Sequence, residues 1–289
     1  MIPAAFEYQR PTSVDEALAL LAEHGSDAKL LAGGHSLLPL MKLRLARPER
    51  LIDIGRLEAL RGVGDGPEGT VRIGALTTYG ELIEDPRIAG FGALADALPR
   101  IGDVQVRNRG TIGGSIAHAD PAADLAAVLL ALDATVVARS AARGEREIEI
   151  ERFFEGPFAT ALADDELLTE IRLPLALASE TVGSAYESID QQASGYPIAG
   201  VAAVVGERTR IAVTGVGDHA YRASGVEAAL GDTQLAAAEG EEHLIEAAIS
   251  HITAGIQVSG DIHADPEYRA AMARVMARRA IELARARLG

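Results

Sequence analysis

The alternation of apolar and polar residues predicts one strand and two helices at the start of the chain. Ser13 is expected to cap a helix over residues 14–24, because acidic residues occupy its first turn and Gly25 follows its end. An apolar run over residues 28–32 predicts a short buried strand, and residues 37–45 show the periodicity of a second helix. Two glycines separate this strand from this helix, so the expected order is strand, double glycine, helix.

The same pattern predicts further strands and helices as far as Pro174, which stops the last of these strands. Asp120 is expected to cap an apolar helix that has Pro121 in its first position. The expected strands cover residues 51–54, 71–75, 135–138 and 167–173, and the expected helices cover residues 91–98, 122–132 and a short segment that ends at residue 82.

The chain changes character after residue 176. Residues 176–183 are rich in alanine and serine, and we expect them to form the linker between two domains. Strand-like runs over residues 184–193, 198–205 and 209–216 predict an antiparallel three-stranded sheet, and helical periodicity over residues 239–256 and 266–288 predicts helices behind it. The expected organisation is an α+β chain with a first domain over residues 1–176, divided into subdomains of about 1–57 and 58–176, and a second domain over residues 177–289.

Composition narrows the class of protein. A content of 48% hydrophobic and 24% charged residues is typical of a folded protein, and the net charge of −15 argues against nucleic acid or an anionic membrane as a partner. The chain has no cysteine, so its own residues form no disulfide, no catalytic thiolate and no cysteine-ligated iron–sulfur cluster. Neither a signal-peptide pattern nor a membrane-spanning apolar run is seen, which predicts a cytoplasmic protein without membrane insertion.

Two glycine-rich turns are the candidate binding chemistry. Glycine lets a backbone approach a phosphate closely and adopt positive φ, and backbone N–H groups bind phosphate oxygens. A single Gly-Gly turn is more often structural than functional, but two such turns flanked by hydroxyl side chains predict a site for a dinucleotide diphosphate. The first turn consists of Ala32, Gly33, Gly34, His35 and Ser36, and the second consists of Thr111, Ile112, Gly113, Gly114 and Ser115.

Taken in order, the motifs resemble those of the FAD-binding medium subunits of molybdenum hydroxylases, the group that includes aerobic carbon monoxide dehydrogenase and the flavin domain of xanthine dehydrogenase. The resemblance spans nearly the whole chain, and its motifs are specific when they occur together. They lie at residues 32–39, 51–54 and 73–79, and at residues 106–115 running into residues 117–124.

The resemblance implies a fold, a cofactor and a set of contacts. The fold would be a two-part FAD-binding domain of the vanillyl-alcohol-oxidase/PCMH type, followed by a small C-terminal domain of the carbon monoxide dehydrogenase flavoprotein type. Both glycine turns would hold the FAD diphosphate and neighbouring groups. Asp124 would reach a hydroxyl of the cofactor, Leu168 would line the site and Tyr196 would lie near the isoalloxazine.

The implied function is electron transfer within a larger oxidoreductase. FAD would take electrons from [2Fe–2S] clusters of a small partner subunit and pass them to an external acceptor, while a molybdenum-containing large subunit oxidises the substrate. The resemblance also suggests a dimer of such three-subunit units. The substrate is selected on another chain, so this sequence identifies neither the substrate nor the electron acceptor.

The sequence departs from the family pattern near the flavin-ring end of the implied site. Many relatives carry a lysine where this chain has Ser188, and often arginines where it has Gln191 and Gln192. Nearby cations stabilise the negative charge of a reduced flavin, so we expect Ser188 to affect the redox properties more than binding.

Other patterns have simpler explanations. The run Gly215 to Ala220 imitates a nicotinamide-binding fingerprint, but the next predicted helix begins only near Ser224, so a plain turn is preferred. His118-Ala119-Asp120-Pro121 could suggest a metal site, yet residues 263–266 repeat the same tetrapeptide where no site is suspected. Arg107 and Arg109 could balance a diphosphate or simply solvate a loop.

Two other functions remain open from the residues alone. One is a self-sufficient FAD-dependent oxidoreductase, which would need acid and base residues of its own in a substrate pocket. The other is a non-catalytic assembly protein that has kept the fold without the cofactor.

Overall fold

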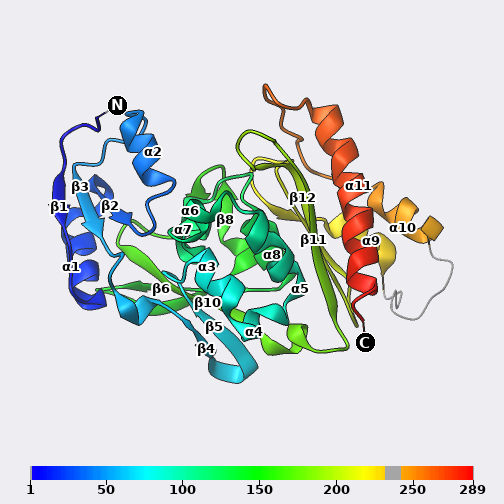
Figure 1. Ribbon diagram of the computed structural model, residues 1–289, viewed down its shortest axis with the longest axis horizontal. Helices are drawn as coiled ribbons and strands as arrows, with labels where there is room; N and C mark the ends of the chain where they lie inside the picture. Colours follow the sequence, from blue (N-terminus) through cyan, green and yellow to red (C-terminus); the bar gives the residue numbers. More distant parts are fainter. Residues whose placement is uncertain (1, 232–241, 289) are drawn as a thin grey trace.

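The computed structural model describes residues 2–231 and 242–288, and its main sheets follow one another along the longest axis (Figure 1). The first sheet is parallel, with strand order β1-β3-β2. Helix α1 packs on it through Ala17, Leu18 and Leu21, and the Ser13 hydroxyl caps this helix by accepting a hydrogen bond from the Glu16 N–H at 3.1 Å. The elements of this part are β1 (Glu7–Gln9), α1 (Val14–His24), β2 (Ala28–Leu31), α2 (Leu37–Lys42) and β3 (Arg50–Asp53).

The second sheet is antiparallel and five-stranded, with order β4-β5-β10-β6-β7. Short helices cover it, and Thr78 begins α3 with a capping box that it shares with Glu81. The strands are β4 (Val63–Asp65), β5 (Thr70–Gly74), β6 (Thr135–Ser140), β7 (Gly144–Glu149) and β10 (Glu166–Pro174), beside the small hairpin of β8 (Phe154–Gly156) and β9 (Ala159–Thr160). The helices are α3 (Tyr79–Glu84), α4 (Pro86–Ala89), α5 (Gly92–Ala97), α6 (Val104–Arg107), α7 (Ile112–His118) and α8 (Asp124–Ala131).

The third sheet has the order β11-β12-β13-β14 and is antiparallel throughout. Its first three strands were expected, and the two-residue strand β14 extends them. Helices α9, α10 and α11 belong to the same part of the molecule. The elements are β11 (Gly183–Asp190), β12 (Pro197–Val205), β13 (Arg210–Thr214), β14 (Tyr221–Arg222), α9 (Ser224–Leu230), α10 (Glu242–Ile249) and α11 (Pro266–Arg285). Residues 239–241 of the expected penultimate helix lie outside the described residues.

Strand β12 is apolar along nearly its whole length because both of its faces are buried. Val201, Ala203 and Val205 join the core made with α9, α10 and α11, whereas Ala202 and Val204 join the core of the second sheet and its helices. Side chains alternate across a strand, so one run of apolar residues serves two cores. The third sheet therefore lies between α11 on one face and α5 with α8 on the other (Figure 1).

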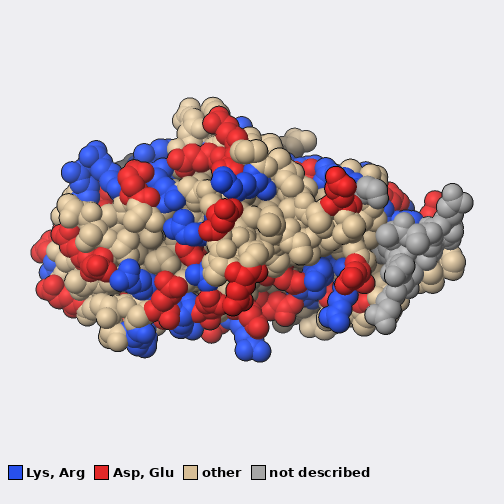
Figure 2. All heavy atoms as spheres, turned by 90° about the horizontal axis from the view of Figure 1, so that it is seen from below, with Lys and Arg blue, Asp and Glu red and all other residues tan. Residues whose placement is uncertain are grey.

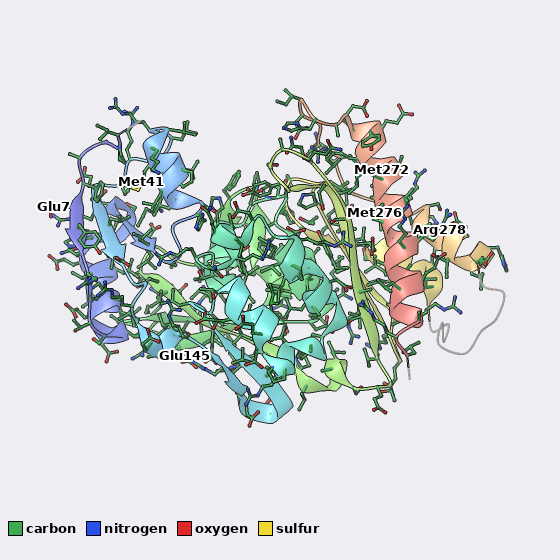
Figure 3. The ribbon with its side chains drawn as sticks, in the orientation of Figure 1. Glu7, Met41, Glu145, Met272, Met276 and Arg278 are labelled. Atoms are coloured by element: carbon green, nitrogen blue, oxygen red, sulfur yellow. The ribbon has the colours of Figure 1, made fainter. Side chains whose placement is uncertain are left out.

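Helix α11 buries one face in the core and exposes the other. Met276 is 2% exposed and lies in the core, whereas Arg278 lies on a more exposed side and forms an ion pair with Glu246 of α10 (Figure 3). One arginine of this helix, Arg269, is instead buried and donates a hydrogen bond to the Ile198 carbonyl at 2.8 Å. The polar residues of this helix therefore do not all lie on its exposed side.

Several helix boundaries differ from the expectation: α10, for example, ends at Ile249 and not at residue 256. Two of the differences, in α2 and α8, have a visible cause. Helix α2 ends at Lys42, because Arg44 adopts φ of 60° and the Leu45 N–H donates back to the Leu40 carbonyl. Helix α8 begins at Asp124, so the expectation that Asp120 caps it is wrong.

The cause of the late start of α8 lies in the third sheet. The Pro121 carbonyl accepts hydrogen bonds from the Thr214 hydroxyl and the Gly215 N–H, both at 2.9 Å. It therefore does not serve as an acceptor within the helix. Asp120 instead caps a turn by accepting a hydrogen bond from the Ala122 N–H. The second copy of the tetrapeptide behaves as expected, with Asp265 as cap of α11 and Pro266 in its first position.

The surface carries mixed charges. Figure 2 shows acidic and basic side chains interspersed over the face that it presents. Across residues 2–231 and 242–288, no helix is both long enough and apolar enough to cross a membrane.

An ion pair between the buried Glu166 carboxylate and the more exposed Arg146 predicts acid sensitivity. Glu166 accepts hydrogen bonds from Arg146 at 2.8 Å through both of its oxygens, and mainly for this reason the pKa of Glu166 falls to about 2. A carboxyl whose pKa is lower in the folded state stabilises the fold above its unfolded pKa, and this contribution is lost as the pH falls through the folded value.

We therefore expect the free energy of unfolding of the wild-type chain to decrease as the pH is lowered from about 5 towards 2. Glu166→Gln should lower stability at neutral pH and flatten this decrease. Urea unfolding followed by circular dichroism at a series of pH values measures both effects. Equal pH slopes in the two proteins would contradict the prediction.

Candidate functional site

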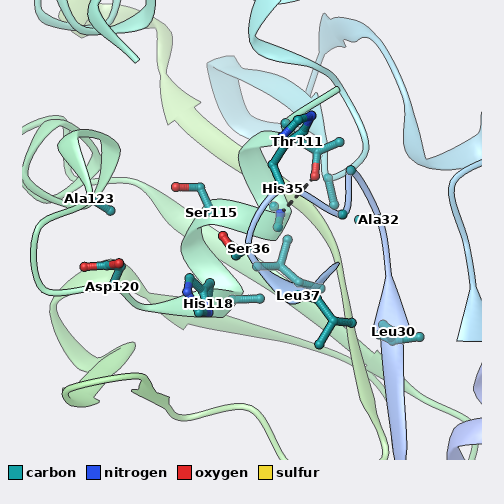
Figure 4. A pocket seen from close by; sticks show the side chains of 18 of the residues that line it. Leu30, Ala32, His35, Ser36, Leu37, Thr111, Ser115, His118, Asp120 and Ala123 are labelled. Carbon is teal, nitrogen blue, oxygen red and sulfur yellow. Dashed lines mark hydrogen bonds between the residues drawn. The ribbon is translucent and has the colours of Figure 1, made fainter. Parts of the chain in front are cut away.

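A cavity of about 830 Å³ lies where the first sheet, the second sheet and the third sheet meet. Both glycine turns, the loop that precedes α8, strand β10 and the hairpin between β11 and β12 contribute to its wall. His35 and Ser36 of the first turn, and Thr111 and Ser115 of the second, surround the same space (Figure 4). The volume lies within the range of cofactor pockets, and contributions from several subdomains are common in such sites.

The structure brings the predicted site residues together with one exception. Ile112 is fully buried in the core and does not line the cavity. The predicted residues that line the cavity are Ala32, Gly33, Gly34, His35, Ser36, Thr111, Gly113, Gly114, Ser115, Asp124, Leu168 and Tyr196.

The first glycine turn contacts the backbone of Arg109 and Gly110, which lead directly into the second turn. A Cβ atom on Gly33 would lie 2.1 Å from the Arg109 carbonyl oxygen and 3.0 Å from Gly110 Cα. Gly110 in turn packs against Tyr79, whose ring would lie 2.5 Å from an added Cβ. These glycines are therefore required for the close approach of the first subdomain to the second.

The first turn presents unpaired backbone donors to the cavity. Within the part of the chain that the structure describes, the N–H groups of residues 33–37 have no protein acceptor. Gly34 makes this path possible, because its φ of 79° lies in the left-handed region. A row of free N–H groups on a cavity wall is the arrangement that binds phosphate oxygens.

The second turn differs, because its backbone donors are already used. The Ile112 N–H bonds to the Thr77 carbonyl, the Gly113 N–H to the Ala75 carbonyl at 2.9 Å, and the Gly114 N–H to the Thr111 hydroxyl. The expectation that both turns present free N–H groups is therefore wrong for residues 112–114. This turn can offer a ligand its hydroxyl groups and a surface without side chains.

Asp124 is 6% exposed and lines the cavity from the first position of α8. Its Oδ1 accepts a hydrogen bond from the Tyr186 hydroxyl at 2.8 Å. Burial raises the pKa of Asp124 to about 7, against the opposing effect of the Tyr186 hydrogen bond. The repulsion of Asp190 adds to this rise. A buried carboxyl with a raised pKa on a cavity wall marks a candidate functional group.

Tyr196 also lines the cavity, from the end of the loop that joins β11 to β12, and is 47% exposed. The hairpin is closed by a hydrogen bond from the Gln191 N–H to the Tyr196 carbonyl at 2.8 Å. An arginine lies near Ser188: the Arg100 guanidinium is 3.4 Å from the Ser188 hydroxyl. Neither Ser188 nor Arg100 lines the described cavity, so the effect of Ser188 on a flavin stays a prediction.

Several cavity residues were missed by the sequence analysis. Tyr79 is buried beneath the second turn, and burial raises its pKa to about 12. Asp120 and His118 line the cavity although their tetrapeptide was interpreted as purely structural. The His118 ring packs on Phe158 with centroids 5.1 Å apart, and burial lowers the pKa of His118. Both residues follow the second glycine turn closely in the sequence, and this proximity was the signal that could have identified them.

The two arginines beside the second turn are separate from the site. Arg107 donates hydrogen bonds to the carbonyls of Ile101 and Gly102, the latter at 2.8 Å, and so stabilises a loop. Arg109 is exposed. The described wall of the cavity includes neither side chain.

Comparisons with known proteins agree with this architecture. The family described as "FAD binding domain in molybdopterin dehydrogenase" matches residues 4–176, and "CO dehydrogenase flavoprotein C-terminal domain" matches residues 184–284. The chain is 43% identical to the carbon monoxide dehydrogenase medium chain of Hydrogenophaga pseudoflava, over 99% of each chain. It is 36% identical to the glyceraldehyde dehydrogenase medium chain of Sulfolobus acidocaldarius, over 98% of this chain and 99% of that one.

Solved structures give the same result. The carbon monoxide dehydrogenase structure from Hydrogenophaga pseudoflava superposes with a TM-score of 0.92 at 43% identity and covers 100% of both chains. Quinoline 2-oxidoreductase from Pseudomonas putida 86 superposes with a TM-score of 0.89 at 29% identity, over 99% of both chains.

The contact between the glycine turns predicts a stability effect. Gly33→Ala places a methyl group against the Arg109 carbonyl, so we expect a loss of about 1–3 kcal/mol or more in the free energy of unfolding. Gly64→Ala is the matched control, because nothing lies within 4 Å of its added Cβ. Thermal unfolding of both variants measures the difference, and an unchanged melting temperature for Gly33→Ala would contradict the contact.

Proposed function

The chain belongs to the FAD-binding medium subunits of the molybdenum hydroxylases, and we propose that it binds FAD in the cavity between its two glycine turns. As such a subunit it is the flavin-carrying oxidoreductase component of a larger complex and has an electron-transfer role. The observation that carries the proposed site is the row of unpaired N–H groups over residues 33–37, on the wall of a cavity that also holds the buried Asp124.

The residues present fit the cofactor. The free N–H groups of residues 33–37 can bind the diphosphate oxygens. The Thr111 and Ser115 hydroxyls flank the second turn, and the Asp124 carboxylate can accept a hydrogen bond from a hydroxyl of the cofactor. Tyr196 is partly exposed at the cavity and can cover one end of the bound molecule.

The protein binds and orients while FAD, when bound, supplies the electron-accepting and electron-donating chemistry. Burial of Tyr79, Leu168 and the second turn excludes water from the inner wall. The contact between the two turns holds the N–H donors in place before the ligand arrives, which reduces the entropy lost on binding. We therefore assign no acid or base step to this chain.

The complex supplies what the chain lacks. A large subunit carrying molybdenum and a small subunit carrying [2Fe–2S] clusters are the partners of this family of medium subunits, and this chain has no cysteine to hold such clusters itself. We propose that electrons pass from the partner's clusters to FAD and on to an external acceptor. We further propose a cytoplasmic complex that is a dimer of three-subunit units.

We propose the division of the chain into domains over residues 1–176 and 177–289, with a subdomain junction near residue 57. The ends of the two family matches, at residues 176 and 184, support the main boundary. The separate first and second sheets support the junction within the first domain.

The proposed site is tested by substituting a glycine of the first turn. Gly34→Ala strains a residue at φ of 79°, so the N–H groups on either side of it should turn from their positions. We expect FAD affinity to decrease at least about tenfold. Reconstitution of the full chain with FAD, followed by the visible spectrum and a fluorescence titration, measures the affinity.

Gly62→Ala is the matched control, because Gly62 also has positive φ, with open space around its added Cβ, but lies outside the cavity wall. This variant should lose stability through the same backbone strain and keep its FAD affinity. A wild-type chain that binds no FAD, even with its partner subunits present, would overturn the proposed function.

A further inference from the structure

A buried hydrogen bond joins the C-terminal domain to the cavity wall. Tyr186 lies on β11 of the third sheet and is fully buried, and its hydroxyl donates to Asp124 Oδ1 at 2.8 Å. Asp124 begins α8 in the first domain and lines the cavity. The pair therefore connects a cavity residue with a side chain that does not itself line the described cavity.

The position of Tyr186 is set by its neighbours. On the adjacent strand β12, a Cβ atom on Gly200 would lie 2.1 Å from the Tyr186 hydroxyl, so only glycine leaves room for that group. The Tyr186 N–H donates to the Asp96 carboxylate at 3.0 Å. Asp96 in turn is held by Arg287 through two hydrogen bonds, of 2.7 and 2.8 Å. The phenol is thus fixed at its backbone and at its hydroxyl end.

The same sheet also holds the loop in front of Asp124. The Thr214 hydroxyl, which is fully buried, lies 2.9 Å from the Pro121 carbonyl and 3.0 Å from the Ala123 carbonyl. The Gly215 N–H donates to the Pro121 carbonyl as well. The C-terminal domain therefore determines both where α8 begins and which way its first side chain is held.

Charged groups act on Asp124 in opposite directions. Arg100 lowers its pKa, and Asp190 raises it by repulsion. Tyr79, Tyr196 and Asp120 also lie near the carboxyl but carry no positive charge. The Tyr186 hydroxyl is thus the main neutral group that stabilises the ionised form.

We propose that Tyr186 is a positioning residue of the cofactor site: it holds the Asp124 carboxyl in place and in its ionised form, ready to accept a hydrogen bond from a hydroxyl of bound FAD. The inference rests on the proposed function. It makes the C-terminal domain part of the cofactor site through a residue outside the cavity wall.

The pH dependence of FAD affinity tests the role of Tyr186. In the wild-type chain, affinity should rise as the pH increases through about 7, because the ionised carboxylate is the better acceptor. In Tyr186→Phe the hydrogen bond that favours ionisation is lost, so the midpoint should move up by about one pH unit. Affinity at pH 7 should then be about fivefold weaker and should recover at about pH 9.

Two further variants make the result specific. Tyr221→Phe is the matched control, because it also removes a buried phenol hydroxyl of the C-terminal domain, one that donates to the Ile252 carbonyl away from the cavity. Its affinity profile should match that of the wild type. Asp124→Asn should bind FAD more weakly and without the pH dependence, and it provides the test if Tyr186→Phe does not fold.

The outcomes are distinguishable. A Tyr186→Phe profile that is lowered equally at every pH would show a merely structural residue and overturn the inference, as would a pH dependence that persists in Asp124→Asn. A wild-type chain that binds FAD with a flat profile would overturn the inference and leave the proposed function standing. Absence of FAD binding by the wild type would overturn the proposed function itself and the inference with it.

Discussion

The contact between two backbone turns is the constraint on which the rest of the site depends. Gly33 can approach the Arg109 carbonyl only because it has no Cβ, and this approach brings the parallel sheet of the first subdomain against the antiparallel sheet of the second. The cavity is the space left beside that contact. Its backbone donors come from the first turn alone, since the N–H groups of residues 112–114 are already bonded to acceptors within the second subdomain. The first turn thus supplies free donors to the cavity, whereas the backbone of the second turn is held within its own subdomain.

The C-terminal domain contributes to the site by holding residues of the first domain that line the cavity or lie next to it. Its sheet takes the Pro121 carbonyl away from α8, and its buried tyrosine holds the first side chain of that helix. Neither group needs to touch a ligand. The hydrogen bond from Tyr186 opposes the effect of burial on Asp124, so this hydroxyl helps to stabilise a carboxylate on the cavity wall.

Much of this architecture could be predicted from local patterns. Helix α1, strands β2 and β10 and the two glycine turns follow from periodicity, capping and turn residues, which act over a few positions. The start of α8 could not be predicted, because Asp120-Pro121 satisfies every local rule for a helix start and is overruled by a hydrogen bond from Thr214. The unequal use of N–H groups and the link from Tyr186 to Asp124 are likewise tertiary, since both depend on partners remote in the sequence.

Strand β12 has a consequence for the order in which the chain can fold during synthesis. Helix α8 leaves the ribosome well before residues 197–205, and all of its residues are buried in the finished molecule, partly under that strand. The apolar surface of α8 therefore stays at least partly exposed until β12 has been synthesised. Residues 1–176 can form their two sheets early, but the aspartate at the head of α8 acquires its final setting only afterwards. The cavity is therefore complete only after the C-terminal domain has been made, and we expect FAD to bind after that point.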